Sequence, residues 1–360
     1  MELKKRILVA PLNWGLGHAT RCIPIINALI DNNFTPILAS DGIALELLKK
    51  EFPEVKTVEL PPYNITYSKK GGSLKTKLIM DSPKMLKAIK GEKKLVKKLV
   101  EDKEIDGIIS DNRLGVFNKN VPSVFISHQL NVLSGSTSWF SSKIHQKIIK
   151  KFSECWVPDV EFEPSLSGKL GHIEKSRINI RYIGPLSRFR KVDETILFDL
   201  MVLLSGPEPQ RTILEKKLLI DLKGFKGKIV FVRGLVEEKQ TCNKKGSMTI
   251  YNYMESKELE KTINRSKMVL SRSGYTTIMD LAKLEKKAFF IPTPGQYEQE
   301  YLAKRLDDLR LTPSCSQDDF KIEMLQKANR YYGLHTFNHK VDFKQLFKLF
   351  QSEGKLTANT

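Results

Sequence analysis

Short apolar segments alternate with stretches of helical spacing along most of the chain. In the first half, five such segments have the length and composition of buried strands, at residues 6–10, 35–39, 55–59, 106–110 and 121–127. Buried strands that are joined by helices are typical of a parallel sheet. The chain is therefore expected to have an α/β fold.

A second series of strand-like segments follows, at residues 199–204, 228–232, 247–251, 268–271 and 288–291. Between the two series, residues 155–157 form another candidate strand before a polar stretch, and residues 182–185 look like an exit toward a linker. A chain of 360 residues also exceeds what one hydrophobic core usually supports. We therefore predict two Rossmann-like domains, residues 1–188 and 196–338, with the boundary near residues 186–196.

The C-terminal segment, residues 339–352, contains a helical pattern. Phe343, Leu346, Phe347 and Phe350 have the spacing of one helix face, which predicts an amphipathic helix over residues 342–351. The tail that follows, residues 352–360, is expected to be a frayed end.

The chain carries a formal net charge of +19, and much of it comes from one stretch. Residues 69–101 contain eleven Lys and three acidic residues. Ser82 and Pro83 are predicted to begin a basic amphipathic helix there. A solvated lysine-rich face is one interpretation, and docking on anionic lipid, as a peripheral membrane association, is the other. No interleaved aromatic and basic motif indicates a nucleic acid partner.

The four cysteines lie far apart, without the close pairing that zinc or dithiol chemistry requires, which favours a reduced cytoplasmic setting. The apolar run after Met1 breaks at Pro11 and is too short for a signal peptide. The chain also lacks an apolar segment of 18 residues. A cytoplasmic protein, with the cytoplasmic membrane face as a further option, is therefore expected.

The segment from Ser271 to Asp280 reads Ser-Arg-Ser-Gly-Tyr-Thr-Thr-Ile-Met-Asp and leads from an apolar strand into a helix. Small residues let the backbone approach an anion, and the first N–H groups of the helix point at it with the positive end of the dipole behind them. Thr276 and Thr277 add hydroxyl donors, and Asp280 could accept hydrogen bonds from ribose hydroxyls. The segment predicts a phosphate site, with ordinary helix capping as the alternative.

The next predicted strand ends in the segment 291–300, Ile-Pro-Thr-Pro-Gly-Gln-Tyr-Glu-Gln-Glu. Its polar groups emerge at the same carboxyl edge of the sheet, where ligands bind in open α/β sheets. Gln299 and Glu300 could bind sugar hydroxyls, and Tyr297 could form a wall of the pocket. A plain turn is the alternative, but two such loops one strand apart favour a nucleotide-sugar site.

These two segments resemble the C-terminal signature of glycosyltransferase family 28, which includes the peptidoglycan lipid-intermediate N-acetylglucosaminyltransferase and plant monogalactosyldiacylglycerol synthase. The resemblance implies the GT-B fold, with two Rossmann-like domains facing across a cleft and a C-terminal helix packing back on the N-terminal domain. It also implies that the Ser-Arg-x-Gly loop binds the donor diphosphate, that Asp280 binds ribose and that Gln299 and Glu300 hold the sugar. The family usually has Glu at the position of Asp280, a difference that could alter nucleotide preference.

Residues 13–21, Asn-Trp-Gly-Leu-Gly-His-Ala-Thr-Arg, resemble the N-terminal Gly-rich loop of the family. His18 stands at a predicted helix start, where a neutral imidazole can remove a proton from an acceptor hydroxyl. His18 is therefore the candidate general base. Asp111 and His128 follow strands at the same sheet edge, and Asp111 could orient His18 or stabilise its charge. A structural role is the alternative for each of the three.

The loop that begins the second domain, residues 205–211, departs from the family pattern. It has two prolines and an acid where relatives are commonly richer in small residues, and proline removes an N–H donor. Gln210 and Arg211 are expected to compensate through their side chains.

The expected reaction is displacement at the anomeric carbon, with inversion, which transfers a hexose or N-acetylhexosamine from a nucleotide diphosphate sugar to an acceptor hydroxyl. UDP is expected on family grounds, and the acceptor is expected to be a glycan or a lipid-linked molecule. No cofactor and no metal are expected, because the helix N-terminus with Arg272 or Arg211 can neutralise the leaving diphosphate and no Asp-x-Asp motif is present. A sugar-nucleotide epimerase of the same fold and a non-catalytic nucleotide-sugar-binding protein are the alternatives.

The predicted site residues fall into three groups, which are catalytic His18 and Asp111, acceptor-side Asn13, Trp14 and His128, and donor-binding Gly17, Ser205, Gly206, Arg211, Arg272, Ser273, Gly274, Thr276, Thr277, Asp280, Gln299 and Glu300.

Overall fold

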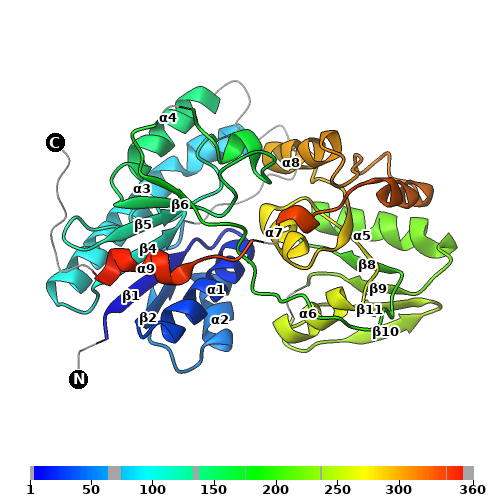
Figure 1. Cartoon of the computed structure of the whole chain (residues 1–360), viewed down its shortest axis with the longest axis horizontal. Coiled ribbons are helices and arrows are strands. Elements are labelled where there is room, and N and C mark those ends of the chain that lie inside the picture. Colours follow the sequence, from blue (N-terminus) through cyan, green and yellow to red (C-terminus); the bar gives the residue numbers. More distant parts are fainter. Residues whose placement is uncertain are drawn as a thin grey trace. The chain divides into compact units, whose positions relative to one another are not determined.

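The computed structural model describes residues 4–63, 74–132, 138–174, 176–235, 237–337 and 339–351. The chain divides into two compact units (Figure 1). The first unit combines the N-terminal part of the chain, up to Arg188, with the C-terminal segment from Lys340, and the second unit runs from Phe189 to His339. Each unit has its own sheet.

The first unit is built on a seven-stranded sheet in which every neighbouring pair is parallel. In the order β3-β2-β1-β4-β5-β6-β7, the strands are β3 (Thr57–Glu59), β2 (Thr35–Ser40), β1 (Arg6–Pro11), β4 (Gly107–Asp111), β5 (Ser123–Ile126), β6 (Glu154–Val157) and β7 (Ile180–Tyr182). The central strands are buried, which is why they appear in the sequence as continuous apolar runs.

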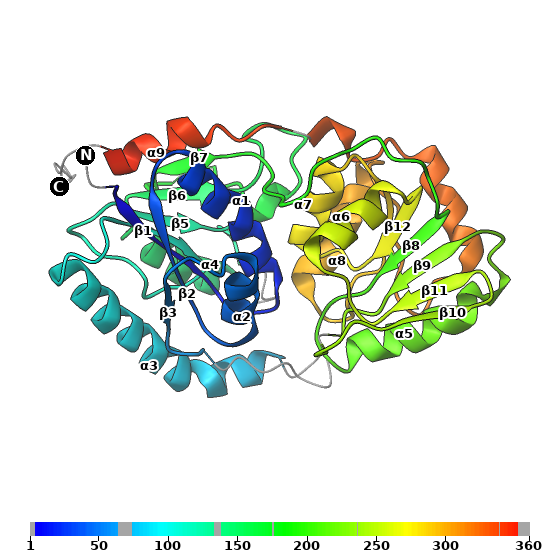
Figure 2. The same ribbon diagram turned by 90° about the horizontal axis from the view of Figure 1, so that it is seen from below.

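Helices cover both faces of this sheet (Figure 2). They are α1 (Gly17–Asp31), α2 (Gly42–Glu51), α3 (Leu74–Glu101), α4 (Ser138–Ile149), the 3-10 turn η3 (Gly168–Leu170) and α9 (Phe343–Gln351). Val96 and Leu99 of α3 pack in one cluster with Leu8 and Ala10 of β1. Side chains alternate between the two faces along a strand, so Ile7 of β1 lies on the face opposite α3.

The C-terminal helix α9 packs on that opposite face of the first unit. Phe347 and Phe350 are buried and form aromatic contacts with Phe34 and Trp156. A Cβ atom on Gly107 of β4 would come within 2.6 Å of the Phe350 ring, so glycine at this position lets the helix approach the strand. The predicted amphipathic helix and its packing on the N-terminal unit are confirmed.

The second unit has a six-stranded sheet with the order β10-β11-β9-β8-β12-β13. The strands are β8 (Leu200–Leu203), β9 (Ile229–Val232), β10 (Cys242–Lys245), β11 (Met248–Tyr251), β12 (Met268–Ser271) and β13 (Lys287–Phe290). All neighbouring pairs are parallel except β10 with β11, which form an antiparallel hairpin. The helical segments are α5 (Gln210–Asp221), η4 (Leu222–Gly224), α6 (Ser256–Asn264), α7 (Tyr275–Lys283), α8 (Tyr297–Asp308), η5 (Ile322–Arg330) and η6 (His335–Phe337).

Four features of the elements differ from the sequence expectations or extend them. The long helix α3 begins at Leu74, so the prediction that Ser82 and Pro83 begin it was wrong. A proline inside a helix removes one backbone hydrogen bond, and the remaining turns of this long helix continue on both sides of it. The residues predicted as an exit toward a linker include the end of a strand, β7.

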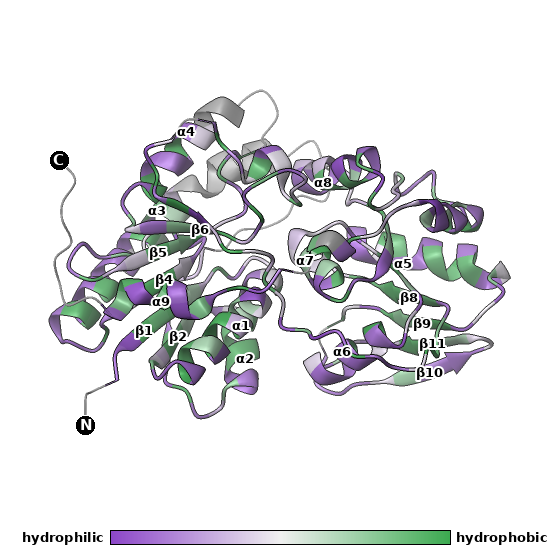
Figure 3. Cartoon of the chain, viewed as in Figure 1, coloured by the Kyte–Doolittle hydropathy of each residue, from purple (hydrophilic) through white to green (hydrophobic). Residues whose placement is uncertain are grey.

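Strand β10 is absent from the predicted series because its residues are exposed and mostly hydrophilic (Figure 3), so it has no apolar pattern. The segment after Arg188 is tied to the second unit, since the Arg190 and Val192 N–H groups donate to Glu260 and Asn264. The predicted frayed tail, residues 352–360, lies outside the described residues, as do residues 69–73 and the side chains of residues 74–82 in the basic stretch.

Candidate active site

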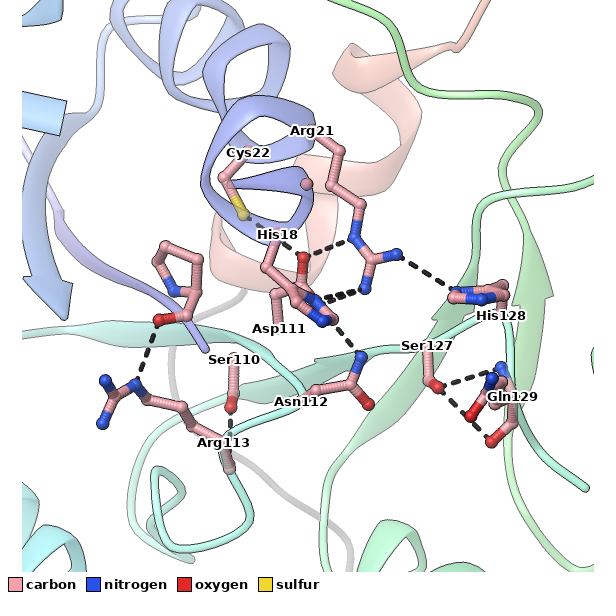
Figure 4. A network of polar contacts seen from close by, with 12 residues as sticks. His18, Arg21, Cys22, Ser110, Asp111, Asn112, Arg113, Ser127, His128 and Gln129 are labelled. Atoms are coloured by element: carbon pink, nitrogen blue, oxygen red, sulfur yellow. Dashed lines mark hydrogen bonds and ion pairs between the residues drawn. The ribbon is translucent and has the colours of Figure 1, made fainter. Parts of the chain in front are cut away.

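His18 and Asp111 lie together at the carboxyl edge of the first sheet (Figure 4). His18 is the second residue of α1, directly after the loop that follows β1, and Asp111 is the last residue of β4. His18 Nδ1 lies 2.9 Å from an oxygen of Asp111. Nδ1 also lies 3.0 Å from Arg21 Nη2, which is a donor. We assign the proton to Nδ1 because its shorter contact is to the carboxylate, whose oxygens can only accept, and Nε2 is then the basic nitrogen of the ring.

Arg21 completes this pair, one helical turn after His18. Its guanidinium donates to both oxygens of Asp111, with an Nε to Oδ2 distance of 2.5 Å. The Arg21 and Asp111 side chains are 1% and 0% exposed, and the His18 side chain is 16% exposed. The buried ion pair is therefore covered, and the imidazole is the member of the group that solvent reaches.

The charge state of Asp111 follows from these contacts. Burial by itself would raise the pKa of this carboxyl, but the charge of Arg21 and the hydrogen bonds from Arg21 and His18 outweigh burial. The pKa of Asp111 therefore lies well below its ordinary value, and the group is an anion near neutral pH. An imidazole that donates to a buried carboxylate is held in one tautomer and one orientation.

His128 belongs to the same group, two residues after β5. Arg21 Nη1 lies 3.1 Å from His128 Nδ1 (Figure 4). Arginine can only donate, so His128 Nδ1 accepts and its proton is on Nε2. The structure thus brings the three predicted residues of the first unit together, and it gives His18 and His128 opposite tautomers through Arg21 and Asp111.

The predicted acceptor-side residues Asn13 and Trp14 lie in the loop between β1 and α1. Trp14 is 36% exposed. Asn13 Nδ2 donates to Asp41 at 2.9 Å, and Asp41 pairs with the buried Arg113. Arg113 Nη1 also lies 2.9 Å from Glu92 of α3.

Sequence analysis did not identify this second ion network. Tyr63 donates to Glu92 at 2.8 Å, and the Gly115 N–H donates to the same carboxylate at 2.9 Å. Burial raises the pKa of Glu92, and Arg113 and Tyr63 oppose that rise. The network connects α3 to the loop that carries Asn13.

In the second unit, the predicted phosphate segment lies at the start of α7. Gly274 precedes the helix, and its carbonyl accepts the first helical hydrogen bond, from the Ile278 N–H. Thr276 and Thr277 are therefore in the first turn, whose N–H groups have no carbonyl partner within the helix. Asp280 is partly buried one turn further along. This geometry agrees with an anion-binding helix N-terminus.

Arg272 is buried behind this loop. Its Nη1 and Nη2 atoms donate to the carbonyls of Ile291, Pro292 and Gln210 and to the side chain of Gln317. Burial lowers the pKa of Arg272 to about 10, so the group keeps its charge at neutral pH. Arg272 therefore connects three loops, and its predicted role in neutralising the leaving diphosphate stays a prediction.

Arg211, the other arginine predicted to act on the diphosphate, is paired with acidic residues. It is buried, and its guanidinium donates to Glu208 and to Glu215, with an Nη1 to Oε2 distance of 2.6 Å for the second pair. Two carboxylates thus offset its charge. Ser205 and Gly206 of the same loop are exposed, and Gly206 has φ of +107°.

The polar groups of the second predicted loop bond within that loop. Gln299 accepts from the Thr293 N–H at 2.9 Å, and Glu300 accepts from the Gly295 N–H at 2.8 Å. Ser273 Oγ donates to the Gln299 carbonyl at 2.8 Å, which joins this loop to the start of α7. Both loops therefore occupy the same sheet edge, as predicted.

Within the described ranges, the side chains of His, Cys, Asp and Glu form no group of three or more that could hold a metal ion. None of the described helices combines the length and the apolar composition that a membrane crossing requires.

Comparison with known proteins agrees with this architecture. Residues 210–333 match the glycosyltransferase family 28 C-terminal domain. A 120-residue segment is 28% identical to the UDP-N-acetylglucosamine--N-acetylmuramyl-(pentapeptide) pyrophosphoryl-undecaprenol N-acetylglucosamine transferase of Sulfurihydrogenibium sp. (strain YO3AOP1). The segment covers 31% of this chain and 33% of that protein, so the chain matches about a third of the relative's length.

Solved glycosyltransferase structures match nearly the whole chain. The glycotransferase of kitacinnamycin superposes with a TM-score of 0.65 and 13% identity, covering 97% of this chain and 100% of that one. MurG of Acinetobacter baumannii gives a TM-score of 0.59 and 12% identity, covering 97% and 99%. The predicted fold and the predicted resemblance are confirmed. The chain therefore has the GT-B fold, and its residues 210–333 are similar to the C-terminal domain of glycosyltransferase family 28.

Proposed function

We propose that the protein is an inverting glycosyltransferase that transfers a hexose or N-acetylhexosamine from a UDP-sugar to an acceptor hydroxyl without a metal ion. The observation that carries the proposal is the buried Arg21–Asp111 ion pair, which orients the partly exposed imidazole of His18. The family 28 match of the second unit supports a nucleotide-sugar donor. The relative from Sulfurihydrogenibium, whose name includes UDP-N-acetylglucosamine, supports UDP as the nucleotide.

In the proposed reaction, His18 is the general base. The acceptor oxygen bonds to the anomeric carbon, the bond from that carbon to the diphosphate oxygen breaks, and the hydroxyl proton passes to His18 Nε2. UDP leaves with the bonding electrons. Because Asp111 is an anion beside Nδ1, it stabilises the positive charge that develops on His18 as the proton arrives.

Arg21 has an indirect role in this scheme. It keeps the buried Asp111 ionised. It also donates to Nδ1 of His128, which fixes this second imidazole with its proton on Nε2. His128 can then donate a hydrogen bond to the acceptor, but it is not placed in the role of base. Arg21 and His128 thus act on orientation, and proton transfer falls to His18.

The second unit is proposed to hold the donor. The first turn of α7, with Thr276 and Thr277, offers N–H and hydroxyl donors to the diphosphate, and Asp280 is proposed to accept from the ribose. Charge on the leaving diphosphate is stabilised by the helix N-terminus and by the nearby positive charge of Arg272, which contributes through the field and not through a hydrogen bond.

A lipid-linked or membrane-surface acceptor at the cytoplasmic membrane face is the favoured acceptor class. At 100° per residue, the exposed lysines of α3 cover the half of the helix that points away from the sheet. They are Lys84, Lys87, Lys90, Lys93, Lys94, Lys97 and Lys98. A field of this kind attracts anionic lipid headgroups, at about 1 kcal/mol per residue near the surface.

The proposal is tested by binding and turnover with purified protein. We expect thermal stabilisation by UDP and at least one UDP-sugar without added metal, its loss in Asp280→Ala and its retention in His18→Gln. UDP release in the presence of membrane lipid extract should depend on His18. Absence of stabilisation by UDP, GDP, dTDP and their sugars would refute the transferase proposal. An equal rate in His18→Gln would remove the base from the scheme.

A further inference from the structure

Among the buried side-chain atoms of the second unit that make no hydrogen bond to any described residue, two belong to residues on segments that meet. They are the Thr293 hydroxyl and the side-chain oxygen of Gln210. Thr293 is 3% exposed. Buried polar groups in folded proteins are nearly always paired, and a ligand that bonds to both atoms would account for these two.

Arg272 brings these two residues to the same place. One end of its guanidinium donates to the Gln210 carbonyl at 2.9 Å, and the other end donates to the Pro292 carbonyl, directly before Thr293, at 2.9 Å. The loops after β8 and β13 therefore meet at a single side chain. These two hydrogen bonds use backbone carbonyls, so they do not involve the Thr293 hydroxyl or the side-chain oxygen of Gln210.

The same two residues border the predicted donor site. The Thr293 hydroxyl lies 4.0 Å from the position that a Cβ atom on Gly206 would occupy. The Thr293 N–H and the Ser273 hydroxyl both donate to Gln299, which joins Thr293 to the loop before α7. Both residues thus belong to segments that follow strands at the carboxyl edge of the sheet, and Thr293 is joined to the loop before the helix N-terminus assigned to the diphosphate.

The chemistry of the pair selects the kind of group it can bind. An amide oxygen only accepts hydrogen bonds, whereas a threonine hydroxyl both donates and accepts. Phosphate oxygens also only accept near neutral pH, so Gln210 Oε1 has nothing to bond on a diphosphate. A sugar hydroxyl, in contrast, can donate to an amide oxygen and accept from a threonine hydroxyl.

We propose that Gln210 and Thr293 form a subsite for one hydroxyl of the transferred sugar and that they help to select the donor sugar. The inference rests on the proposed function, because it presupposes a nucleotide-sugar donor in the second unit. It assigns discrimination between sugars to two residues of which Thr293 had no predicted role and Gln210 was expected to contact diphosphate.

The test replaces the hydroxyl by a methyl group of the same shape, in Thr293→Val. Thr312→Val is the matched control, because Thr312 is 1% exposed and its hydroxyl is also unpaired. Its N–H donates to the Leu306 carbonyl near the end of α8, and Leu306 lies about 13 Å along the helix axis from Tyr297 at the start. Gln210→Met removes the amide oxygen and keeps the length of the side chain.

Dissociation constants are measured by calorimetry for UDP, UDP-glucose, UDP-galactose and UDP-N-acetylglucosamine. We expect Thr293→Val and Gln210→Met each to weaken the preferred UDP-sugar about tenfold and to leave UDP within about twofold. We expect Thr312→Val to leave every constant unchanged. Both valine variants should raise the melting temperature of the unliganded protein, because each removes an unpaired buried hydroxyl.

Equal weakening of UDP and the UDP-sugars in Thr293→Val would overturn the subsite, because the hydroxyl would then serve the nucleotide or the fold. Unchanged binding of every ligand in both Thr293→Val and Gln210→Met would overturn it as well. If wild-type protein binds none of these four ligands, the proposed function fails first. That outcome differs from the other two, in which wild-type protein still binds.

Discussion

Asp111→Asn offers the most direct test of the proposed chemistry. The substitution keeps the size of the side chain and an oxygen that can accept from Arg21, but it removes the negative charge beside His18. The charge matters when the imidazole takes up a proton. Without it, Arg21 is a nearby cation with no counter-ion, which further disfavours the imidazolium.

The magnitude follows from the distances. Two unit charges about 4 Å apart attract by about 4 kcal/mol at an effective dielectric constant of about 20. Each 1.4 kcal/mol corresponds to roughly a factor of ten in rate, so the full attraction is about a thousandfold. Because Arg21 already binds both oxygens of Asp111, part of this attraction is offset. We therefore expect turnover to fall by about a hundredfold to a thousandfold.

The assay is UDP release from the UDP-sugar that wild-type protein uses, with its acceptor or with water alone. The Michaelis constant for the donor should change little, because the donor is assigned to the other unit. Cys22→Ala is the control, since its thiol lies 3.7 Å from the same carboxylate but bears no charge there. If Asp111→Asn, folded as judged by circular dichroism, keeps more than about a tenth of the turnover, the charge argument is wrong.

Four further predictions follow from other contacts. Arg21→Met leaves a buried carboxylate without its cation and should lower the free energy of unfolding by about 3–5 kcal/mol. Tryptophan fluorescence measures this change, because all three tryptophans belong to the first unit. An unchanged unfolding midpoint would contradict the buried pair. Phe350→Ala should lower stability by a similar amount, about 3–5 kcal/mol, in the same assay, and a loss under 1 kcal/mol would mean that α9 does not hold the unit. Arg272→Lys keeps a charge but cannot bond to three loops, so UDP affinity in calorimetry should fall about tenfold or more; full retention would show that charge alone matters. The double variant Lys87→Glu, Lys94→Glu should sediment less with anionic vesicles than wild-type protein does. If wild-type protein binds the vesicles equally at low and high salt, the lysines of α3 do not bind lipid by electrostatic attraction.

The fold was predictable because its central strands are buried on both faces. Such strands appear as short apolar runs, and parallel strands place the residues that follow them at one sheet edge, which located His18, Asp111 and His128 from three separate segments. Strand β10 could not be found in this way. Its residues are exposed, and it pairs with β11 across a turn made at Gly246, where φ is +61°.

The polar contacts of the site were less predictable, because the sequence does not show which residue a charged side chain will pair with. Arg21 follows His18 by three residues, a spacing that places both on one helix face, and this was the available signal for its role. Arg211 was expected to face diphosphate, yet two acids one turn away on either side, Glu208 and Glu215, are equally available to it. Arg113 and Glu92 are distant in sequence, so only the folded chain shows them paired.

The packing of α9 on the first unit also concerns the order in which the protein is made. The second unit is complete at His339, but the first unit obtains its last helix only from the segment after it. Until that helix emerges from the ribosome, Phe34 and Trp156 lack the aromatic partners that cover them in the finished protein. Domains generally fold as units during synthesis. In this chain, the half that is begun first is therefore the half that is finished last.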